Sequence, residues 1–387
     1  MVTKQLIIEE FKTLIKKLKH DVHIMESKKE DKKVINAVNF KIRNFVKVIK
    51  SLEGFDNVDI EKADDVKDLD GIGKGSLTRI DEIIKTGTLK EAHVEVSDED
   101  SQIAKRVEAL MTITGIGPSK AAELNKEGIT LGKLLDEYKK NKDNIDESSI
   151  LKELTHHQII GLKYYKQFMK KIPREKIDKI DAKIQKLLKK YLKTLENPLT
   201  IHAVICGSYR RGATESGDID LLLSGDDKFD LIHFVKFLTD EGLITDHLTE
   251  KGTTKFMGVC DKTGGYRIDI RLVPIESYGA ALMYFTGSKD FNTLVRAEAL
   301  RQGYTLEEYG IYPLVREEEG GTKGNENETE KSTVTVKKKM AHSHQHMKGE
   351  KIPCPNEEVI FDILKLNKKF LDPTERNVDT STNVLSI

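Results

Sequence analysis

Apolar side chains recur every three or four residues through the first part of the chain, from about residue 5 to residue 52. This spacing places them on one face of a helix and predicts a small N-terminal domain of amphipathic helices. The polar faces carry many lysines, which contact either phosphate or solvent, and the pattern by itself favours solvent. The apolar positions are Ile7, Ile8, Phe11, Leu14, Ile15, Leu18, Val34, Val38, Phe45, Val48, Ile49 and Leu52.

The pattern changes after Pro173, where short apolar runs predict β-strands at 203–206, 219–223 and 267–273. Before that point, the segment 96–101 (VSDEDS) is acidic and rich in turn-forming residues. We expect it to be a linker between two helical domains. The chain is therefore expected to be a multidomain α+β protein, with helical domains first and a mixed α/β region after them.

Length and composition narrow the class of protein. A chain of 387 residues suits two to four compact domains. Lys+Arg and Asp+Glu both number 64, so the formal net charge of +0 argues against a uniformly basic coat and leaves any polyanion binding to local patches. Cys206, Cys260 and Cys354 form no close pair, which favours a reducing intracellular compartment over a disulfide framework or a zinc site. The N-terminus resembles neither a signal peptide nor a membrane span, so we expect a protein that is not secreted and has no membrane partner.

One short motif occurs twice, at 69–73 (LDGIG) and at 113–117 (ITGIG), each time before a predicted helix. Its glycines permit a tight turn, and the helix that follows directs unpaired N–H groups outward, where a phosphate oxygen can bind without any base being read. A single copy is as readily a glycine-closed turn without a ligand, but the duplication favours DNA. The residues expected to bind DNA here are Gly71, Gly73, Lys74, Arg79, Gly115, Gly117, Ser119 and Lys120. Such hairpins commonly hold a monovalent cation, Na⁺ or K⁺, through backbone carbonyls, here those of Leu69, Ile72, Ile113 and Ile116.

The strongest chemical signal is the segment 206–223, CGSYRRGATESGDIDLLL. Asp218 and Asp220 are two residues apart on a predicted strand, so both carboxylates project from one face. Neighbouring carboxylates need a cation, and Mg²⁺ prefers oxygen ligands while it keeps positions for substrate phosphates. A third carboxylate comes from GYRIDIRLV, in which Asp269 lies on the face opposite to two isoleucines. One aspartate in a strand can simply protect a sheet edge, but together Asp218, Asp220 and Asp269 are expected to be catalytic and to bind two Mg²⁺ ions, which Mn²⁺ can replace.

A turn at Gly207 and Ser208 precedes these aspartates. Its backbone N–H groups, the Ser208 hydroxyl and the Arg211 guanidinium suit the β- and γ-phosphates of a nucleoside triphosphate. The GS…DxD arrangement predicts nucleotidyl transfer by in-line displacement at the α-phosphorus. We expect Asp269 to serve the metal near the primer 3′-hydroxyl, with Arg267 orienting its carboxylate.

At these residues the chain resembles the family X DNA polymerases, almost continuously from 69 to 313. The resemblance rests on GSYRRG, GDID, RIDIRLVP, YFTGS, the HHQ and IGLKYY stretch that ends in KIPRE, and a C-terminal EEVIFDIL. GS…DxD alone is shared with poly(A) polymerases and antibiotic nucleotidyltransferases, whereas the two hairpins and YFTGS narrow the resemblance to family X. It implies a lyase-type helical domain at 1–94 with the first helix-hairpin-helix motif and a DNA-binding helical domain at 95–172 with the second. A mixed-sheet catalytic palm at 173–275 and a nucleotide-selecting C-terminal α/β domain at 276–387 follow.

The resemblance also implies roles for individual residues. Tyr284 and Phe285 are expected to pack against the deoxyribose and exclude a 2′-hydroxyl, although without the resemblance they would be interpreted as core aromatics. Lys171 replaces an arginine that binds the triphosphate, and Lys289 replaces an aspartate that stacks on the incoming base, so base selection is expected to differ. The implied nucleotide-binding residues are Lys171, Gly207, Ser208, Arg211, Gly217, Tyr284, Phe285, Gly287, Lys289 and Asn292, and Arg267 and Arg296 are implied to contact DNA.

The lyase of the family uses a lysine on the helix after the first hairpin to attack a 5′-deoxyribose phosphate. Aligned through LDGIGKGSLTRIDEII, that position holds Arg79. A guanidinium, whose pKa lies above roughly 12, supplies no free amine, so lyase activity is expected to be weak or absent. The lysines that could substitute lie on different turns or faces: Lys67, Lys74, Lys85 and Lys90.

We therefore expect a monomeric gap-filling repair polymerase that uses dNTPs on gapped or primer-template DNA, in the nucleus or another DNA-containing compartment. A template-independent RNA-tailing transferase would share the carboxylates but would have no reason to carry two DNA hairpins. A DNA-binding scaffold with an inactive domain would have a broken triad, and this triad is intact. Residues 316–351, rich in Gly, Glu, Asn and Lys and containing HSHQH, are expected to form a flexible insertion.

Overall fold

The computed structural model describes residues 2–27, 30–55, 57, 59–69, 71–94, 98–249, 252–316 and 346–378. Most of the insertion predicted at 316–351 therefore lies outside the described residues, as do the histidines that precede His346.

Two long helices dominate the N-terminal part, as the apolar periodicity predicted. They are α1 (Lys4–Ser27) and α2 (Lys32–Glu53), which pack on each other, and Asp31 caps α2 by accepting a hydrogen bond from the Lys33 N–H at 2.8 Å. A two-stranded pair, β1 (Val2–Thr3) and β2 (Asp59–Ile60), and the helix α3 (Lys74–Thr86) complete this part. Its core is built from the predicted apolar positions other than Val34, which is exposed, together with residues of α3, among them Ile80 and Ile83.

A second group of helices follows: α4 (Asp98–Met111), α5 (Pro118–Lys126), α6 (Leu131–Asn141), α7 (His156–Lys163) and α8 (Tyr165–Phe168). The predicted linker at 96–101 is partly wrong, because residues 98–101 form the first turn of α4. Asp98, Glu99 and Asp100 lie at the positive end of the helix dipole, where acidic side chains stabilise a helix. The acidic composition that indicated a linker is in fact a helix-start signal.

The third part is a five-stranded mixed sheet in the order β4-β6-β9-β8-β7. Its strands are β4 (Ile201–Ile205), β6 (Ile219–Gly225), β7 (Ile244–His247), β8 (Lys255–Cys260) and β9 (Tyr266–Pro274). Only the central pair, β6 and β9, is parallel. Three further elements, β3 (Ile172–Pro173), the short helix α10 (Gly207–Arg210) and β5 (Glu215–Ser216), lie around the turn after β4.

Alternation along the two central strands gives the sheet two different faces. Ile219, Leu221, Ile268 and Ile270 are fully buried against helices α9 (Arg174–Leu192) and α11 (Leu231–Asp240). The opposite face carries the aspartates of the same strands. The helices thus close one side of the sheet and leave the aspartate side for chemistry.

The C-terminal part combines α12 (Tyr278–Thr286), α13 (Lys289–Arg301) and α14 (Glu357–Ile363) with a three-stranded antiparallel sheet. The strands are β10 (Tyr304–Glu307), β11 (Gly310–Arg316) and β12 (His346–Lys348). Phe291, Phe361 and Phe370 lie in its core. The multidomain α+β fold class is confirmed, whereas the boundaries assigned to the four domains stay predictions.

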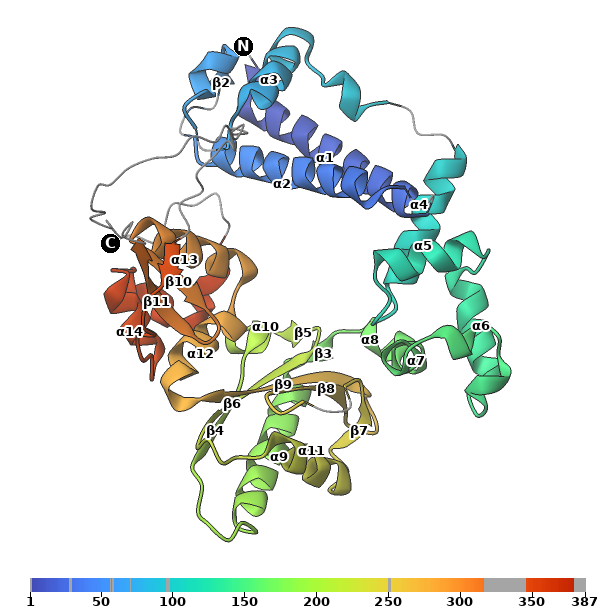
Figure 1. The fold of residues 1–387 in the computed structure, drawn as a ribbon, viewed down its shortest axis with the longest axis vertical. Coiled ribbons are helices and arrows are strands. Elements are labelled where there is room, and N and C mark those ends of the chain that lie inside the picture. Colours follow the sequence, from blue (N-terminus) through green and yellow to red (C-terminus); the bar gives the residue numbers. More distant parts are fainter. Residues whose placement is uncertain are drawn as a thin grey trace, which may run out of the picture.

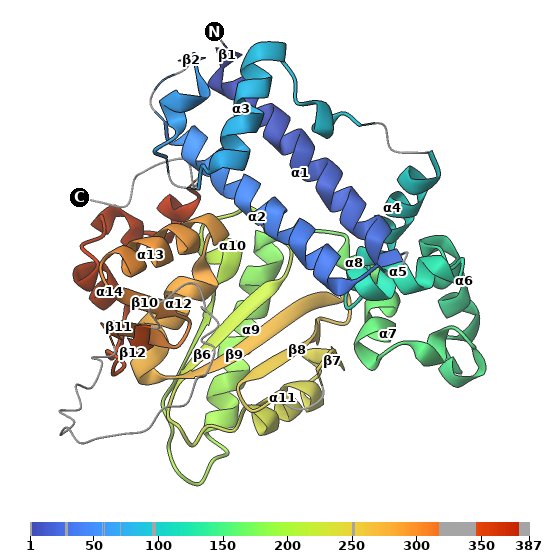
Figure 2. The same cartoon turned by 45° about the horizontal axis from the view of Figure 1, so that its top comes forward.

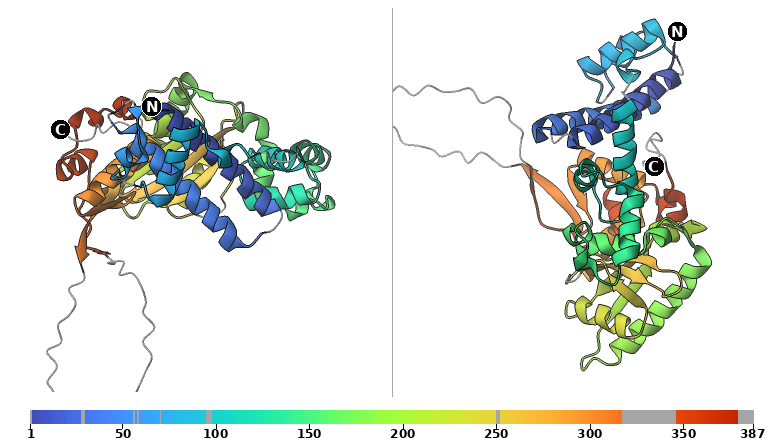
Figure 3. Two further views of the ribbon diagram at one scale, coloured as in Figure 1. Left: turned by 90° about the horizontal axis from the view of Figure 1, so that it is seen from above. Right: turned by 90° about the vertical axis from the view of Figure 1, so that its right-hand side faces the viewer.

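The four parts follow one another around the molecule (Figure 1). Helices α1 and α2 lie at one end, the sheet at the other, and the helices α4–α8 connect them along one side, as the right-hand view of Figure 3 also shows. The C-terminal part lies beside the sheet on the other side, and Figure 2 shows α9 behind β6 and β9.

Candidate active site

Two aspartates meet at the centre of the sheet. Asp220 on β6 and Asp269 on β9 are direct partners in the parallel register, so both side chains lie on the face away from α9. Burial raises the pKa of Asp220 to about 6, and the Asp269 carboxylate adds to the rise. The charge of Arg211 lowers this pKa but does not offset the other two effects. Burial likewise raises the pKa of Asp269, opposed by the charges of Arg267 and Lys255. Asp269 Oδ1 is buried and has no hydrogen-bond partner among the described residues.

Asp218 behaves differently. It directly precedes β6 rather than lying on the strand as predicted, and its carboxylate forms an ion pair with Arg267 Nη2. Arg267 Nε lies 3.9 Å from Asp269 Oδ1. Arg267 thus pairs with Asp218 and reaches Asp269 at ion-pair distance without a hydrogen bond, so its orienting role toward Asp269 stays a prediction.

The carboxylate oxygens are of the ligand type that a hard cation such as Mg²⁺ prefers. Two partly buried, repelling carboxylates with an unpartnered oxygen are unfavourable unless a positive charge joins them, and Mg²⁺ prefers such oxygens. The described residues contain no group of three His, Cys, Asp or Glu side chains already arranged around one point. Asp218 has to leave Arg267 before all three carboxylates can share ions.

The turn after β4 lies directly against Asp220. Gly207 has a φ of +59°, and a Cβ there would meet Asp220 Oδ2 at 2.3 Å, so both the backbone conformation and the space require glycine. The Cys206 N–H donates to the Asp220 carbonyl at 2.7 Å, and the hydroxyls of Ser208 and Ser216 are 2.8 Å apart. The predicted phosphate-binding turn and the predicted metal ligand are thus fixed to each other.

A pocket of about 740 Å³ opens beside this turn. Asp218, Asp220 and Arg296 line it, but Asp269 is not among the lining residues. All the predicted nucleotide-binding residues line it too, from four separate stretches of the chain: Lys171, Gly207, Ser208, Arg211, Gly217, Tyr284, Phe285, Gly287, Lys289 and Asn292. Their contacts with a nucleotide stay a prediction.

The aromatic pair forms one wall of that pocket. The rings of Tyr284 and Phe285 pack edge to face, with centroids 5.0 Å apart, and both are half-buried rather than core residues. Arg296 lies 4.9 Å from the Tyr284 ring centre and Arg271 lies 5.6 Å from that of Phe285. Asn292 donates to the Tyr284 carbonyl at 2.7 Å. The pair is therefore held from both sides at the pocket surface.

An arginine network that the sequence did not reveal ties the turn to the C-terminal part. Arg210 donates to Thr286 Oγ1 at 2.7 Å and to both oxygens of Glu357 at 3.1 and 2.8 Å. Arg376, which is fully buried, donates to the same carboxylate at 2.6 Å. No local signal could have found this pairing, because Arg210 and Glu357 are separated by 147 positions.

The predicted phosphate-binding Arg211 also contacts the C-terminal part. It donates to the Thr286 carbonyl at 2.5 Å and to Asn377 Oδ1 at 2.9 Å. It lines the pocket with its donors directed at protein acceptors, so it has to exchange these bonds to hold a triphosphate.

The two glycine hairpins have the same backbone geometry. Gly71 and Gly115 have φ values of +76° and +91°, so they are the positions that require glycine. Gly73 and Gly117 have ordinary extended φ values, cap the N-termini of α3 and α5, and have open space around a Cβ position. The helix N-termini are therefore unobstructed at these two glycines, as phosphate binding requires.

The other predicted hairpin residues are spread around these turns. Lys74 begins α3, while Ser119 and Lys120 lie in the first turn of α5, where Lys120 pairs with Glu123 at 2.9 Å. In each hairpin the first carbonyl accepts a turn hydrogen bond, from Ile72 N–H to Leu69 at 3.1 Å and from Ile116 N–H to Ile113 at 3.0 Å. Cation binding by Leu69, Ile72, Ile113 and Ile116 stays a prediction.

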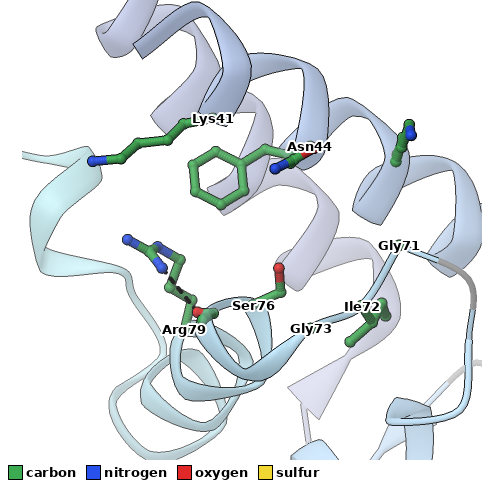
Figure 4. A pocket seen from close by; sticks show the side chains of 10 residues that line it. Lys41, Asn44, Gly71, Ile72, Gly73, Ser76 and Arg79 are labelled. Carbon is green, nitrogen blue, oxygen red and sulfur yellow. Dashed lines mark hydrogen bonds between the residues drawn. The ribbon is translucent and has the colours of Figure 1, made fainter. Parts of the chain in front are cut away.

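A pocket of about 540 Å³ lies between α2 and the first hairpin (Figure 4). Arg79 points into it and is held by Glu91, by the Gly75 carbonyl at 2.8 Å and by the Phe45 ring, whose centre is 5.0 Å away. The substitutes considered from the sequence, Lys67, Lys74, Lys85 and Lys90, are not among its lining residues. Lys41 and Lys47 of α2 line it instead, as do Asn44, Gly71, Ile72, Gly73 and Ser76.

Comparisons with known proteins agree with this arrangement. Residues 171–275 match the DNA polymerase beta palm, 281–377 the DNA polymerase beta thumb, and 3–89 a helix-hairpin-helix domain. These matches extend the resemblance beyond the 69–313 range that the motifs covered. In the part of the chain that the structure describes, no helix has the length and apolar character needed to cross a bilayer.

The chain is similar in sequence to several proteins that are named as DNA polymerases. The chain is 29% identical over 300 residues to DNA polymerase lambda of Arabidopsis thaliana, covering 73% of this chain and 52% of the relative. It is 27% identical over 372 residues to DNA polymerase lambda of Rattus norvegicus, covering 92% and 56%. A DNA polymerase type-X family protein, pol4 of Schizosaccharomyces pombe, is 25% identical over 272 residues, covering 65% and 48%. The chain spans about half the length of the curated relatives it matches. From palm, thumb and hairpin domain together, we conclude that the chain belongs to the family X DNA polymerases, close to the beta and lambda members.

Proposed function

We propose that the chain is a DNA-directed DNA polymerase that fills short gaps during DNA repair, with dNTPs as substrates. The observation that carries the proposal is the pocket that joins Asp218 and Asp220 to the Gly207 turn and to the Tyr284–Phe285 pair. A phosphate-binding turn, metal-binding carboxylates and an aromatic wall are what a nucleotidyl transfer to a primer requires.

The chain's own residues have distinct tasks in this mechanism. The backbone of the Gly207 turn, Ser208 and Arg211 bind the β- and γ-phosphates, with Lys171 adding charge. Asp218, Asp220 and Asp269 would hold two divalent cations, Mg²⁺ or Mn²⁺. When bound, these ions acidify the primer 3′-hydroxyl and neutralise the leaving pyrophosphate. Asp269, whose pKa is already raised by burial, can accept the hydroxyl proton.

The aromatic pair, Tyr284 and Phe285, would select the sugar of the incoming nucleotide. Tyr284 and Phe285, held by Asn292 and Arg296, would pack against the deoxyribose and exclude a 2′-hydroxyl. Lys289 replaces the stacking aspartate at the base position, so preferences among bases are expected to differ from those of relatives that keep it.

The two hairpins would hold the DNA by its phosphates alone. Their helix N-termini would bind the backbone on either side of the gap, and the carbonyls of Leu69, Ile72, Ile113 and Ile116 would hold a Na⁺ or K⁺ ion that adds positive charge there. We assign residues 1–94 to DNA-end binding, 95–172 to duplex binding, 173–275 to catalysis and 276–387 to nucleotide selection. The working form would be a monomer in the nucleus or another DNA-containing compartment.

Lyase activity would be weak or absent. Arg79 occupies the position of the nucleophilic lysine and is engaged by Glu91, Gly75 and Phe45, so it can attract a 5′-phosphate but cannot form a Schiff base.

The test is primer extension on a one-nucleotide gap, with and without a downstream 5′-phosphate. We expect a single templated dNMP to be added, faster with the phosphate, and rNTPs to be used poorly. Tailing of single-stranded RNA with rNTPs would overturn the proposal in favour of a terminal transferase.

A further inference from the structure

Helix α9, on the side of the sheet away from the catalytic aspartates, carries a row of exposed lysines. The row follows the i, i+3 and i+7 spacing that keeps side chains on one face, and we call it the lysine stripe. At about 1.5 Å per residue it is about 25 Å long, and its members fall within about 100° of the helix circumference. The members are Lys176, Lys179, Lys183, Lys186, Lys190 and Lys193, all exposed.

The lysine stripe is not needed for the fold. The face that packs against the sheet is a separate apolar set: Ile177, Ile180, Ile184, Leu187, Leu188 and Tyr191. Lysines three or four residues apart repel one another, so the arrangement weakens the helix rather than stabilises it.

Other helices of this chain arrange their charges differently. In the described residues, several lysines on other helices pair with an acid three or four positions away, as in Lys17–Asp21, Lys85–Asp81, Lys139–Asp136 and Lys236–Asp240. Among the described residues, the stripe makes one ion pair, between Lys190 and Glu241, and Glu241 lies outside α9.

The acids of α9 do not neutralise the stripe in the described structure. Asp178 accepts a hydrogen bond from the Tyr209 hydroxyl at 2.7 Å, and Asp181 accepts one from the Gln185 amide at 3.1 Å. Glu175 lies at the N-terminal end of the row, and Glu241 is the neighbour that pairs with Lys190. All three acids of α9 lie within its first eight residues, so the row from Lys183 onward is net positive and faces solvent.

We propose that the lysine stripe is a second DNA-binding site, which takes the phosphate backbone of duplex DNA without reading sequence. A straight row of ammonium groups complements a straight, regularly charged polyanion. Lysines bind phosphate as point charges and lack the planar fork that reads guanine, and the stripe contains no aromatic residue on which unpaired bases could stack. These features favour duplex over single-stranded nucleic acid.

The site is distinct from the catalytic one. The stripe lies on the α9 side of the sheet and Asp220 and Asp269 on the other, so DNA whose primer end is at the aspartates cannot reach it along the same face. A distant segment of the same DNA, or another molecule, would occupy the stripe and keep the protein near DNA between encounters with gaps.

The test compares two triple variants of the full chain with equal loss of charge. One is Lys179→Gln, Lys183→Gln and Lys186→Gln, and the matched control is Lys228→Gln, Lys236→Gln and Lys262→Gln, three exposed lysines elsewhere on the sheet domain. Binding to covalently closed circular duplex is measured from 50 to 300 mM salt. Insertion into a short one-nucleotide-gap duplex is measured in parallel, so that failure of the polymerase proposal shows separately.

We expect the stripe variant to bind closed duplex about tenfold more weakly at moderate salt, with the slope of log K against log[salt] reduced by about 2 to 3. The control should change the slope by less than 1 unit, and gap insertion should stay within about twofold in both. Replacement of the same stripe lysines by arginine should restore duplex binding, which excludes a folding defect. Equal slopes in both variants would overturn the proposal. Binding of polyglutamate is measured as a further comparison. If the stripe variant loses polyglutamate binding but keeps its binding of closed duplex, the proposal is overturned and the stripe is a site for an acidic polypeptide.

Discussion

Asp220 and Asp269 are register partners across the only parallel strand pair of the sheet, and each raises the cost of ionising the other. The pair is partly buried, faces away from the helix-covered side and contains an oxygen, Asp269 Oδ1, that has no hydrogen bond from any described residue. The strongest electrostatic interaction in the site is therefore between these two aspartates, and the described residues contain no preformed cluster of three carboxylates.

Asp269→Ala should lower nucleotide incorporation by several orders of magnitude, because the primer hydroxyl loses both its metal ligand and its proton acceptor. DNA affinity should change little, since the two hairpins, and not Asp269, are expected to bind the DNA backbone. Single-turnover rates and gapped-DNA titrations measure the two effects. An equal loss of rate and of DNA binding would mean that Asp269 has been assigned the wrong role.

Gly73→Val or Gly117→Val should weaken DNA binding and raise the KM for primer-template by a similar factor on every sequence. Both positions have open space and an ordinary φ, so the new side chain blocks the helix N-terminus without straining the fold. Gly71→Val and Gly115→Val are the matched comparison, because their positive φ makes them lower the melting temperature as well. A defect confined to particular DNA sequences would contradict phosphate-only contact.

Arg79→Lys should raise borohydride trapping on incised abasic DNA well above that of the wild-type protein. The amine would project into the same pocket that Arg79 now lines, where a 5′-terminal sugar phosphate is expected. Trapping of the wild type at an efficiency close to that of Arg79→Lys would disprove the prediction. Lys41→Gln and Lys47→Gln would then identify which amine of the pocket reacts.

Glu10 should make the N-terminal helices more stable at neutral than at acidic pH. Burial alone would raise the pKa of this carboxylate, which is 8% exposed, but bonds from the Leu89 N–H at 2.7 Å and from His93 outweigh burial and lower the pKa. The stabilisation is therefore fully present above the unfolded pKa of about 4.3 and is lost as pH falls through the lower folded value.

Glu10→Gln removes the charge and should cost about 1 to 2 kcal/mol near pH 7, with the difference shrinking below about pH 4. Hydrogen exchange of the α1 amides measures this local opening without assuming that the whole chain unfolds in one step. A difference between wild type and variant that is independent of pH would show that the carboxylate charge contributes nothing.

The sequence predicted the parts of the molecule that depend on local patterns. The N-terminal helices follow from a 3.6-residue period, the hairpins from paired glycines, and the strands that hold Asp220 and Asp269 from alternation. Family resemblance supplied Tyr284, Lys289 and Asn292, whose types alone indicated nothing about nucleotides.

The features that the sequence missed depend on contacts between distant positions. Arg267 pairs with Asp218, and Glu357 joins Arg210 to Arg376, and neither pairing has a periodic signal. Lys41 and Lys47 of α2 are exposed, as the pattern indicated, but the pocket that they share with the first hairpin has no signal in the sequence. Such pairings are decided by tertiary packing, which a single sequence does not display.

The most direct test of the account is single-turnover incorporation into a one-nucleotide gap by the wild-type chain and by Asp220→Asn. The wild type should add one templated dNMP in the presence of Mg²⁺, while Asp220→Asn should lose several orders of magnitude in rate and still bind the gapped DNA. Incorporation by Asp220→Asn at a rate near that of the wild type would contradict the assignment of the buried carboxylate pair as the catalytic centre.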